Sequence, residues 1–195
     1  RKAERDGVET AFHRAADMKA CPIGADSACC KHCSMGPCRL NSKDPYAKVG
    51  VCGATIDTIQ ARNFARMVAS GAAAHTDHGM SMLDLFREVV SGHITDYKIK
   101  DTNKLEEVAK ELGIETEGRE VKDIAMDVYK ELERTYTQVE GEIPFAKRVP
   151  PKTLETWRKH GVVPRGAMRE IMEIMHRTHM GVDQAYENLT KQCTR

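Results

Sequence analysis

Six of the chain's seven cysteines lie between residues 21 and 53, and this cluster constrains the fold more than any other feature. Cys193 stands alone near the other end of the 195 residues. So much sulfur in one segment needs a chemical reason, and bound metal would supply the order that the segment itself lacks. We therefore expect 21–53 to be an irregular loop with one helical turn near Cys30–Cys33. The six clustered residues are Cys21, Cys29, Cys30, Cys33, Cys38 and Cys52.

Disulfides, zinc and iron–sulfur are the three chemistries that could explain the cluster. Disulfides need an oxidising compartment, and no apolar segment of signal-peptide or membrane-spanning type is present, although a chain that begins at Arg1 could have lost a leader. Zinc sites usually show two paired Cys/His knuckles, and here only one C-x2-C occurs. Iron–sulfur fits best, because Cys30, Cys33, Cys38 and Cys52 form C-x2-C-x4-C-x13-C.

Glycines flank the last two of these cysteines. Gly36-Pro37 predicts a turn just before Cys38, and Gly50 and Gly53 bracket Cys52. A residue without Cβ lets the backbone approach a cluster closely and direct N–H groups at its sulfurs.

Cys21 and Cys29 remain, which is half of a four-cysteine set. Neighbouring side chains such as Cys29 and Cys30 diverge, so they can face different clusters. A half-site is completed most simply when an identical chain brings the same two residues across a two-fold axis. The alternative is that Cys21 and Cys29 are ordinary buried thiols.

Several phrases of the sequence resemble one family. The phrases CCKHCSMGPCR and GVCGAT, followed by ARNFARMVASGAAAHTDHG, VVPRGAMREI and THMGVD, are similar to the N-terminal region of the catalytic subunit of anaerobic nickel–iron carbon monoxide dehydrogenases. The resemblance implies that Cys30, Cys33, Cys38 and Cys52 hold the 4Fe–4S cluster B. It also implies that Cys21 and Cys29 hold half of the 4Fe–4S cluster D, which two subunits share.

The resemblance further implies the role of the chain. The whole enzyme of that family oxidises CO with water to CO2, two protons and two electrons at a nickel–iron–sulfur C cluster. Because the C-cluster ligands come from a downstream part, we expect a fragment truncated before the active-site domains that does not catalyse alone. We expect the chain to pass electrons through clusters B and D to a ferredoxin-like acceptor. The enzyme is expected to be a cytoplasmic homodimer, and acetyl-CoA synthase is a further candidate partner.

Two rival functions stay open. A hybrid-cluster-protein-like redox domain is related, but its cysteine set is expected to lack Cys21 and the doubled Cys29–Cys30. A zinc-stabilised helical interaction module is the rival without redox activity. The balance of 30 basic and 29 acidic residues gives no argument for a nucleic-acid partner.

Three histidines are the remaining candidate functional residues. In the family, residues at the positions of His75 and His78 begin a row thought to carry protons, but Ser81 and Asp84 occupy its next positions. The alternative is that both are polar residues on a helix surface. His32, between two ligand cysteines, is expected to support the cluster without ligating it.

The rest of the chain predicts an all-α fold in a single domain, 1–195, with a helical bundle over 54–195. Charged residues make up 30% and aromatic residues 5%, a composition typical of packed helices. No stretch alternates convincingly enough for a strand, and 139–151 is expected to be a loop. Met168, Met172 and Met175 are expected in the core. The predicted helices cover 8–19, 55–70, 72–91, 102–111, 121–136, 153–160, 166–179 and 183–192.

Overall fold

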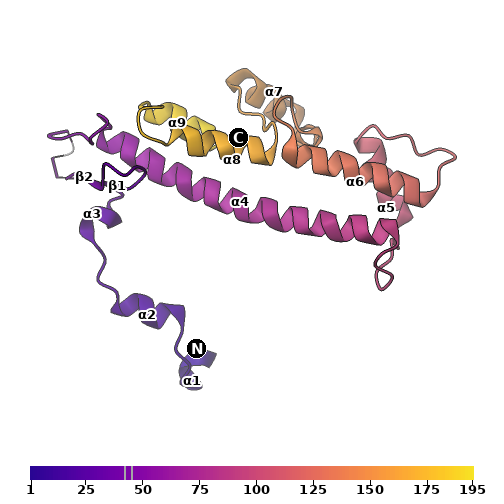
Figure 1. The fold of residues 1–195 in the computed structure, drawn as a ribbon, viewed down its shortest axis with the longest axis horizontal. Coiled ribbons are helices and arrows are strands. Elements are labelled where there is room, and N and C mark those ends of the chain that lie inside the picture. Colours follow the sequence, from indigo (N-terminus) through magenta and orange to yellow (C-terminus); the bar gives the residue numbers. More distant parts are fainter. Residues whose placement is uncertain (42, 45) are drawn as a thin grey trace.

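One long helix, α4 (Ile56–Ser91), forms the axis of the fold (Figure 1). The structure is a computed structural model, and it describes residues 1–41, 43–44 and 46–195. The side chain of Thr55 caps its first turn by accepting from the Thr58 N–H, and Gly92 ends it with a positive φ of 81°. The predicted break between 70 and 72 is wrong, because a single glycine costs a helix only about 1 kcal/mol.

The other helices of the bundle form a second layer along one side of α4 (Figure 1). α6, α8 and α9 pack directly on α4, while α5 packs on α6, and α7 contacts the short 3-10 helix η1 inside the predicted loop 139–151. The all-α prediction is confirmed. The bounds are α5 (Thr102–Glu111), α6 (Val121–Thr137), η1 (Pro144–Arg148), α7 (Pro151–His160), α8 (Ala167–Arg177) and α9 (Tyr186–Gln192).

Several small apolar clusters form the core. One lies at the far end of α4 and buries Ile124, Ala125 and Val128 on the predicted face of α6. The predicted methionine core on α8 is wrong, since Met172 and Met175 are 59% and 41% exposed. The buried face of α8 instead carries Glu170 and Ile174, and Ile174 packs on α4 through Ala65 and Ala69.

The N-terminal segment extends away from the bundle (Figure 1). It contains α1 (Lys2–Arg5), α2 (Ala11–Asp17) and α3 (Pro22–Ala25). The helix predicted over 8–19 is shorter than expected, and its Phe12 is 86% exposed.

Two short strands organise the cysteine-rich segment, where no strand was expected. β1 (Cys29–Cys30) and β2 (Cys38–Arg39) pair antiparallel, with Cys29 opposite Arg39 and Cys30 opposite Cys38. The helical turn predicted at Cys30–Cys33 is therefore wrong. Residues 42 and 45 of the predicted loop lie outside the described residues.

None of the helices in the described part of the chain combines the length and apolar character needed to cross a bilayer.

Candidate metal centre

Four cysteines line one small cavity where the two-stranded hairpin meets the start of α4. They are Cys30, Cys33, Cys38 and Cys52, the four expected to act as one set. The cavity wall is completed by residues of the connection between β1 and β2, of the turn before α4, of α4 itself and of the segment after α8. These are His32, Gly50, Val51, Ala54, Ile59, Arg62 and Met180.

The hairpin and two glycines bring the sulfurs together. Pairing of β1 with β2 sets Cys30 directly opposite Cys38. A Cβ on Gly36 would lie 3.0 Å from the Cys38 nitrogen and 3.2 Å from the Cys30 carbonyl oxygen, so the tight connection between the strands needs glycine. A Cβ on Gly50 would lie 3.6 Å from the Cys38 Sγ, which shows how closely the backbone approaches this thiol.

Hydrogen-bond donors point at two of the sulfurs. The Val51 N–H donates to the Cys38 Sγ at 3.4 Å, and the Arg62 guanidinium donates to the Cys52 Sγ at 3.5 Å. Burial alone would raise the pKa of Cys52, but hydrogen bonds from Arg62 and from the backbone of Ala54 outweigh it and bring the pKa to about 7. The site therefore favours a thiolate at Cys52.

Arg62 is a buried cation, only 1% exposed. Its Nη2 donates to the carbonyl oxygen of Asp183 at 2.8 Å and to the Gln184 side chain at 3.4 Å, and its Nε has no partner. A buried charge is costly unless an opposite charge lies nearby. Among the described residues, the guanidinium donates to the Cys52 sulfur and to uncharged oxygens, and it forms no ion pair with a carboxylate. A cavity with four cysteine sulfurs and a buried cation that no carboxylate neutralises fits an anionic, thiolate-held group.

His32 and Asn63 secure the outer side of the cavity. The His32 Nε2 lies 3.1 Å from the Asn63 Oδ1, and burial holds the pKa of His32 below its ordinary value. A neutral imidazole in this position agrees with a supporting role.

Cys21 and Cys29 do not line this cavity. Cys21 is exposed at the start of α3, where the N–H groups of Gly24 and Ile23 lower the pKa of its thiol. Cys29 is half-buried, and successive strand residues point to opposite faces. All seven cysteines, each within the described part, are free, and no three Cys, His or carboxylate side chains described by the structure converge for a single metal ion.

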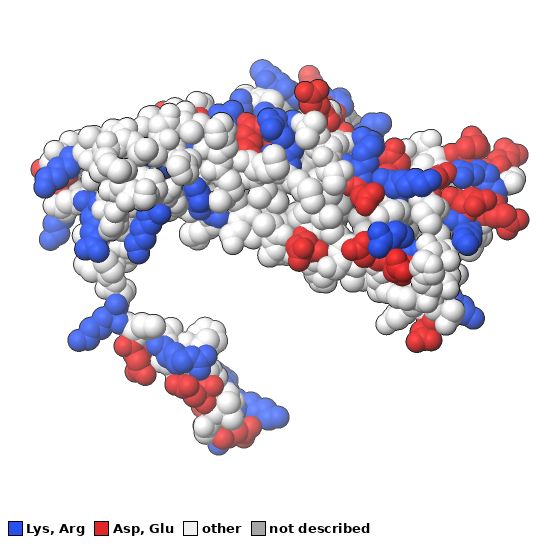
Figure 2. Space-filling model, viewed as in Figure 1, with Lys and Arg blue, Asp and Glu red and all other residues white. Residues whose placement is uncertain are grey.

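The surface around this end of the molecule is rich in positive charge. Figure 2 shows several Lys and Arg side chains around the end that carries β1, β2 and the start of α4, whereas acidic residues gather mostly toward α5. Cationic side chains at this end would partly offset the charge of an anionic group in the cavity.

His75 and His78 lie farther along α4 and are both exposed. The His75 Nδ1 lies 2.9 Å from the Gly71 carbonyl oxygen, and the Ser81 hydroxyl donates to the Asp77 carbonyl at 3.1 Å. Neither histidine lines the cysteine cavity.

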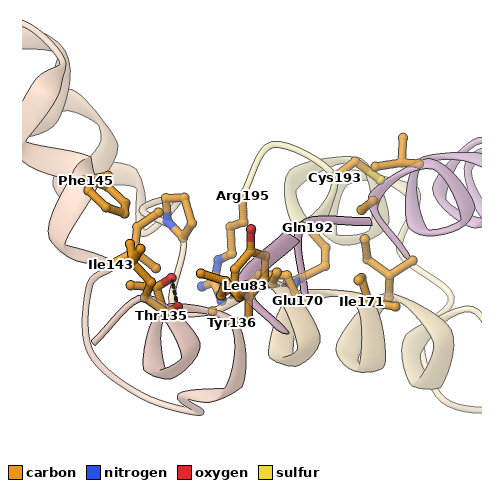
Figure 3. A pocket seen from close by; sticks show the side chains of 18 of the residues that line it. Leu83, Thr135, Tyr136, Ile143, Phe145, Glu170, Ile171, Gln192, Cys193 and Arg195 are labelled. Carbon is orange, nitrogen blue, oxygen red and sulfur yellow. Dashed lines mark hydrogen bonds and ion pairs between the residues drawn. The ribbon is translucent and has the colours of Figure 1, made fainter. Parts of the chain in front are cut away.

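A larger apolar hollow of about 640 Å³ lies between α4, α6, α8 and the C-terminal residues (Figure 3). Leu83, Tyr136, Phe145 and Ile171 are among the residues that line it. Its carboxylate, Glu170, is bound by Arg165 and Gln192. The concentration of thiols and donors therefore makes the cysteine cavity the candidate site.

Arg62, Asn63 and Gln184 are the site residues that the sequence did not single out. One signal was present: Arg62 occupies the apolar stripe of α4 between Ile59 and Ala65, both buried. A charged residue inside such a stripe indicates a buried partner.

Comparisons with known proteins give the family. The family model described as Prismane/CO dehydrogenase family matches residues 28–195. Carbon monoxide dehydrogenase 1 of Methanosarcina mazei is 43% identical over 183 residues, which are 93% of this chain and 29% of the relative. The carbon monoxide dehydrogenase/acetyl-CoA synthase subunit beta of Moorella thermoacetica is 37% identical, over 96% of this chain and 28% of the relative.

The comparison with solved structures indicates the same family as the sequence relatives. The crystal structure of carbon monoxide dehydrogenase from Thermococcus sp. AM4 matches with a TM-score of 0.91 and 40% identity, covering 98% of this chain and 31% of the other. The chain thus spans less than a third of the length of these proteins. With the family model matching most of its length and the whole helical arrangement reproduced in the solved structures, this chain belongs to the Prismane/CO dehydrogenase family.

Proposed function

We propose that this chain is the N-terminal electron-transfer and dimerisation domain of a nickel-dependent carbon monoxide dehydrogenase. The full enzyme would convert CO and water to CO2, two protons and two electrons. The observation that carries the proposal is that Cys30, Cys33, Cys38 and Cys52 line one cavity, in a chain of this family.

Those four cysteines would hold a 4Fe–4S cluster, B, which accepts and releases single electrons when bound. The chain's own residues have three tasks there. Ile59 and Ala54, both almost fully buried, keep water from the cavity. The Val51 N–H and the Arg62 guanidinium donate to sulfur, and Gly50 lets the backbone approach.

Cys21 and Cys29 would hold half of a second 4Fe–4S cluster, D, which an identical chain completes. Their separation from the four-cysteine cavity supports the proposal, since Cys30 lines that cavity and its neighbour Cys29 does not. Adjacent residues on β1 would thereby bring two clusters close enough for electron transfer. The two-fold axis would make this end of the molecule the dimer interface.

The partners and the active site of the full-length protein are inferred from the family. The nickel–iron–sulfur C cluster would be held by other parts of the full-length protein, a cytoplasmic enzyme, and a ferredoxin-like protein would accept the electrons. Acetyl-CoA synthase is a further candidate partner, because the Moorella relative carries that activity in its name. A proton-relay role for His75 and His78 stays a prediction, supported by their exposed positions one turn apart on α4.

The test is the metal content of full-length protein prepared anaerobically. The proposal expects a brown protein with broad visible absorption, and a Cys33→Ser variant that loses one cluster signal. Cys193→Ser is the matched control, because Cys193 is also half-buried but lies outside the cavity, with its thiol donating to the Leu189 carbonyl. A colourless preparation that binds zinc in place of iron would contradict the proposal.

A further inference from the structure

We propose that Arg62 is a positioning residue that raises the reduction potential of the cluster held by Cys30, Cys33, Cys38 and Cys52. It would do so by fixing a buried positive charge against the Cys52 sulfur. This inference rests on the proposed function, since it requires an iron–sulfur cluster in that cavity.

The guanidinium is held in place from three directions. Arg62 projects from α4 between the buried residues Ile59 and Ala65, so its stem is packed in the core. Its Nη1 reaches the Cys52 Sγ at 3.5 Å, and its Nη2 reaches the Asp183 carbonyl oxygen at 2.8 Å. Asp183 lies 121 residues farther along the chain, so tertiary structure fixes the orientation of the cation.

Gln184 ties the same segment to the cysteine turn. The side-chain amide of Gln184 donates to the Cys52 carbonyl oxygen at 2.8 Å, and the backbone carbonyl oxygen of Gln184 accepts from the Thr58 hydroxyl at 2.6 Å. Thr58 is 2% exposed, so its end of this link is buried. The segment that binds Arg62 therefore also binds Cys52, and the distance between cation and sulfur is set by both contacts.

No carboxylate within the described residues neutralises Arg62. The nearby carboxylate of Asp183 pairs with Arg177 at 3.0 Å and gives Arg62 only its backbone oxygen. The Arg62 Nε also lacks a partner. Because a buried cation is strongly unfavourable without an opposite charge, this arrangement is best explained if the cavity holds a group with net negative charge.

A fixed cation changes the energies of the two oxidation states unequally. Reduction adds one negative charge to a thiolate-held cluster, so the reduced state gains more from a nearby positive charge than the oxidised state does. A hydrogen bond to a ligand sulfur acts in the same direction. Removal of the Arg62 charge should therefore make the cluster harder to reduce.

The experiment is a redox titration of the full-length protein, followed by electron paramagnetic resonance. The relevant signal is the one that Cys33→Ser removes. Arg62→Gln, which keeps an amide donor but no charge, should shift the midpoint potential of that signal to more negative values. Arg62→Lys should stay nearer the wild-type potential. Arg66→Gln is the control, because Arg66 lies one turn along α4 and its Nε binds Thr178; its shift should be clearly smaller.

The outcomes separate this inference from the proposed function. A wild-type protein without iron would overturn both. A wild-type level of iron in Arg62→Gln with an unchanged potential, or a shift no larger than that of Arg66→Gln, would overturn only the role of Arg62. If Arg62→Gln loses the cluster, iron retention in Arg62→Lys supports the role of the charge. Iron loss in Arg62→Lys as well would show that packing matters instead, and would overturn the inference.

Discussion

The side-chain amide of Asn63 lies 2.9 Å from the carbonyl oxygen of Ser27, and this contact attaches the cysteine-rich segment to α4. The same nitrogen also donates to the Cys29 carbonyl at 3.2 Å, and the Oδ1 of Asn63 faces His32. Ser27 has a positive φ of 56°, which few non-glycine residues adopt. One side chain on α4 thus holds the backbone at Ser27 and at Cys29 in place.

Asn63→Ala should lower the free energy of unfolding by about 1–3 kcal/mol, because it leaves the partly buried carbonyl groups of Ser27 and Cys29 without this donor. It should also speed the loss of iron from the protein, measured as bleaching of visible absorption during incubation with a chelator. Gln60→Ala is the matched control, since Gln60 makes one exposed contact, to the Asp26 carbonyl oxygen. Equal effects of the two substitutions would argue against the special position of Asn63.

The Cys52 thiol should be more acidic than the Cys193 thiol in metal-free protein. Alkylation of Cys52 should become half-maximal near pH 7, because its pKa is brought to about 7 by Arg62 and backbone donors against the effect of burial. Cys193 is the internal comparison, since burial raises the pKa of its thiol and its alkylation should need pH above 9. Mass spectrometry of peptides labelled across a pH series measures both, and identical profiles would contradict the assignment.

Two glycine substitutions should have opposite effects on stability. A Cβ on Gly166 would collide with the Gln138 carbonyl oxygen, so Gly166→Ala should destabilise the protein by about 1–3 kcal/mol. A Cβ on Gly71, in the middle of α4, would meet nothing within 4 Å, and Gly71→Ala should stabilise the helix by up to about 1 kcal/mol. Thermal unfolding measures both; a lower unfolding temperature for Gly71→Ala would show that other atoms cover this face.

Local sequence patterns predicted part of this fold correctly and failed at Gly71. Local patterns predicted the all-α class and α6, whose stripe through Ile124 and Val128 is buried as expected. The same local information misread the small residues around Gly71 as a break, although glycine alone rarely ends a helix. Cysteine spacing grouped Cys30, Cys33, Cys38 and Cys52, and these four thiols line one cavity, because residues that act together within one short segment leave a recognisable spacing.

Long-range contacts leave no such trace. Two partners of Arg62, Asp183 and Gln184, lie 121 and 122 residues away, so only the packing of α4 against the segment before α9 brings them to Arg62. The short strands β1 and β2 were missed for a similar reason: two residues are too few for an alternating pattern, and their pairing depends on the turn between them.

Buried carboxylates on α8 should make stability depend on pH. Burial alone would raise the pKa of Glu170 and of Glu173, but hydrogen bonds from Arg165 lower both pKa values below the ordinary 4.5. Because the pKa values are lower in the folded state, the contribution of these carboxylates to the free energy of unfolding is complete above about pH 4.5. That contribution is lost as the pH falls through the folded-state pKa. Denaturant midpoints should therefore drop steeply below pH 4.5.

Glu170→Gln should flatten that pH dependence while lowering stability at pH 7. Glu142→Gln is the control, since Glu142 pairs with Arg158 at an exposed position and should change the profile much less. A Glu170→Gln profile as steep as that of the wild type would assign the acid sensitivity to other groups.

Substitution of both Cys21 and Cys29 by serine should remove one cluster and leave the other. Because the proposed D cluster is shared by two chains, the iron content should fall by about two atoms per chain, half of a four-iron cluster. The exposed Cys21 and the half-buried Cys29 lie outside the cavity of Cys30 and Cys52, so the signal of the four-cysteine set should persist. Metal analysis and electron paramagnetic resonance of the same samples measure both effects, with Cys193→Ser as the control. Loss of both signals would show that the two cysteine sets are not independent, and loss of neither would leave Cys21 and Cys29 as ordinary thiols.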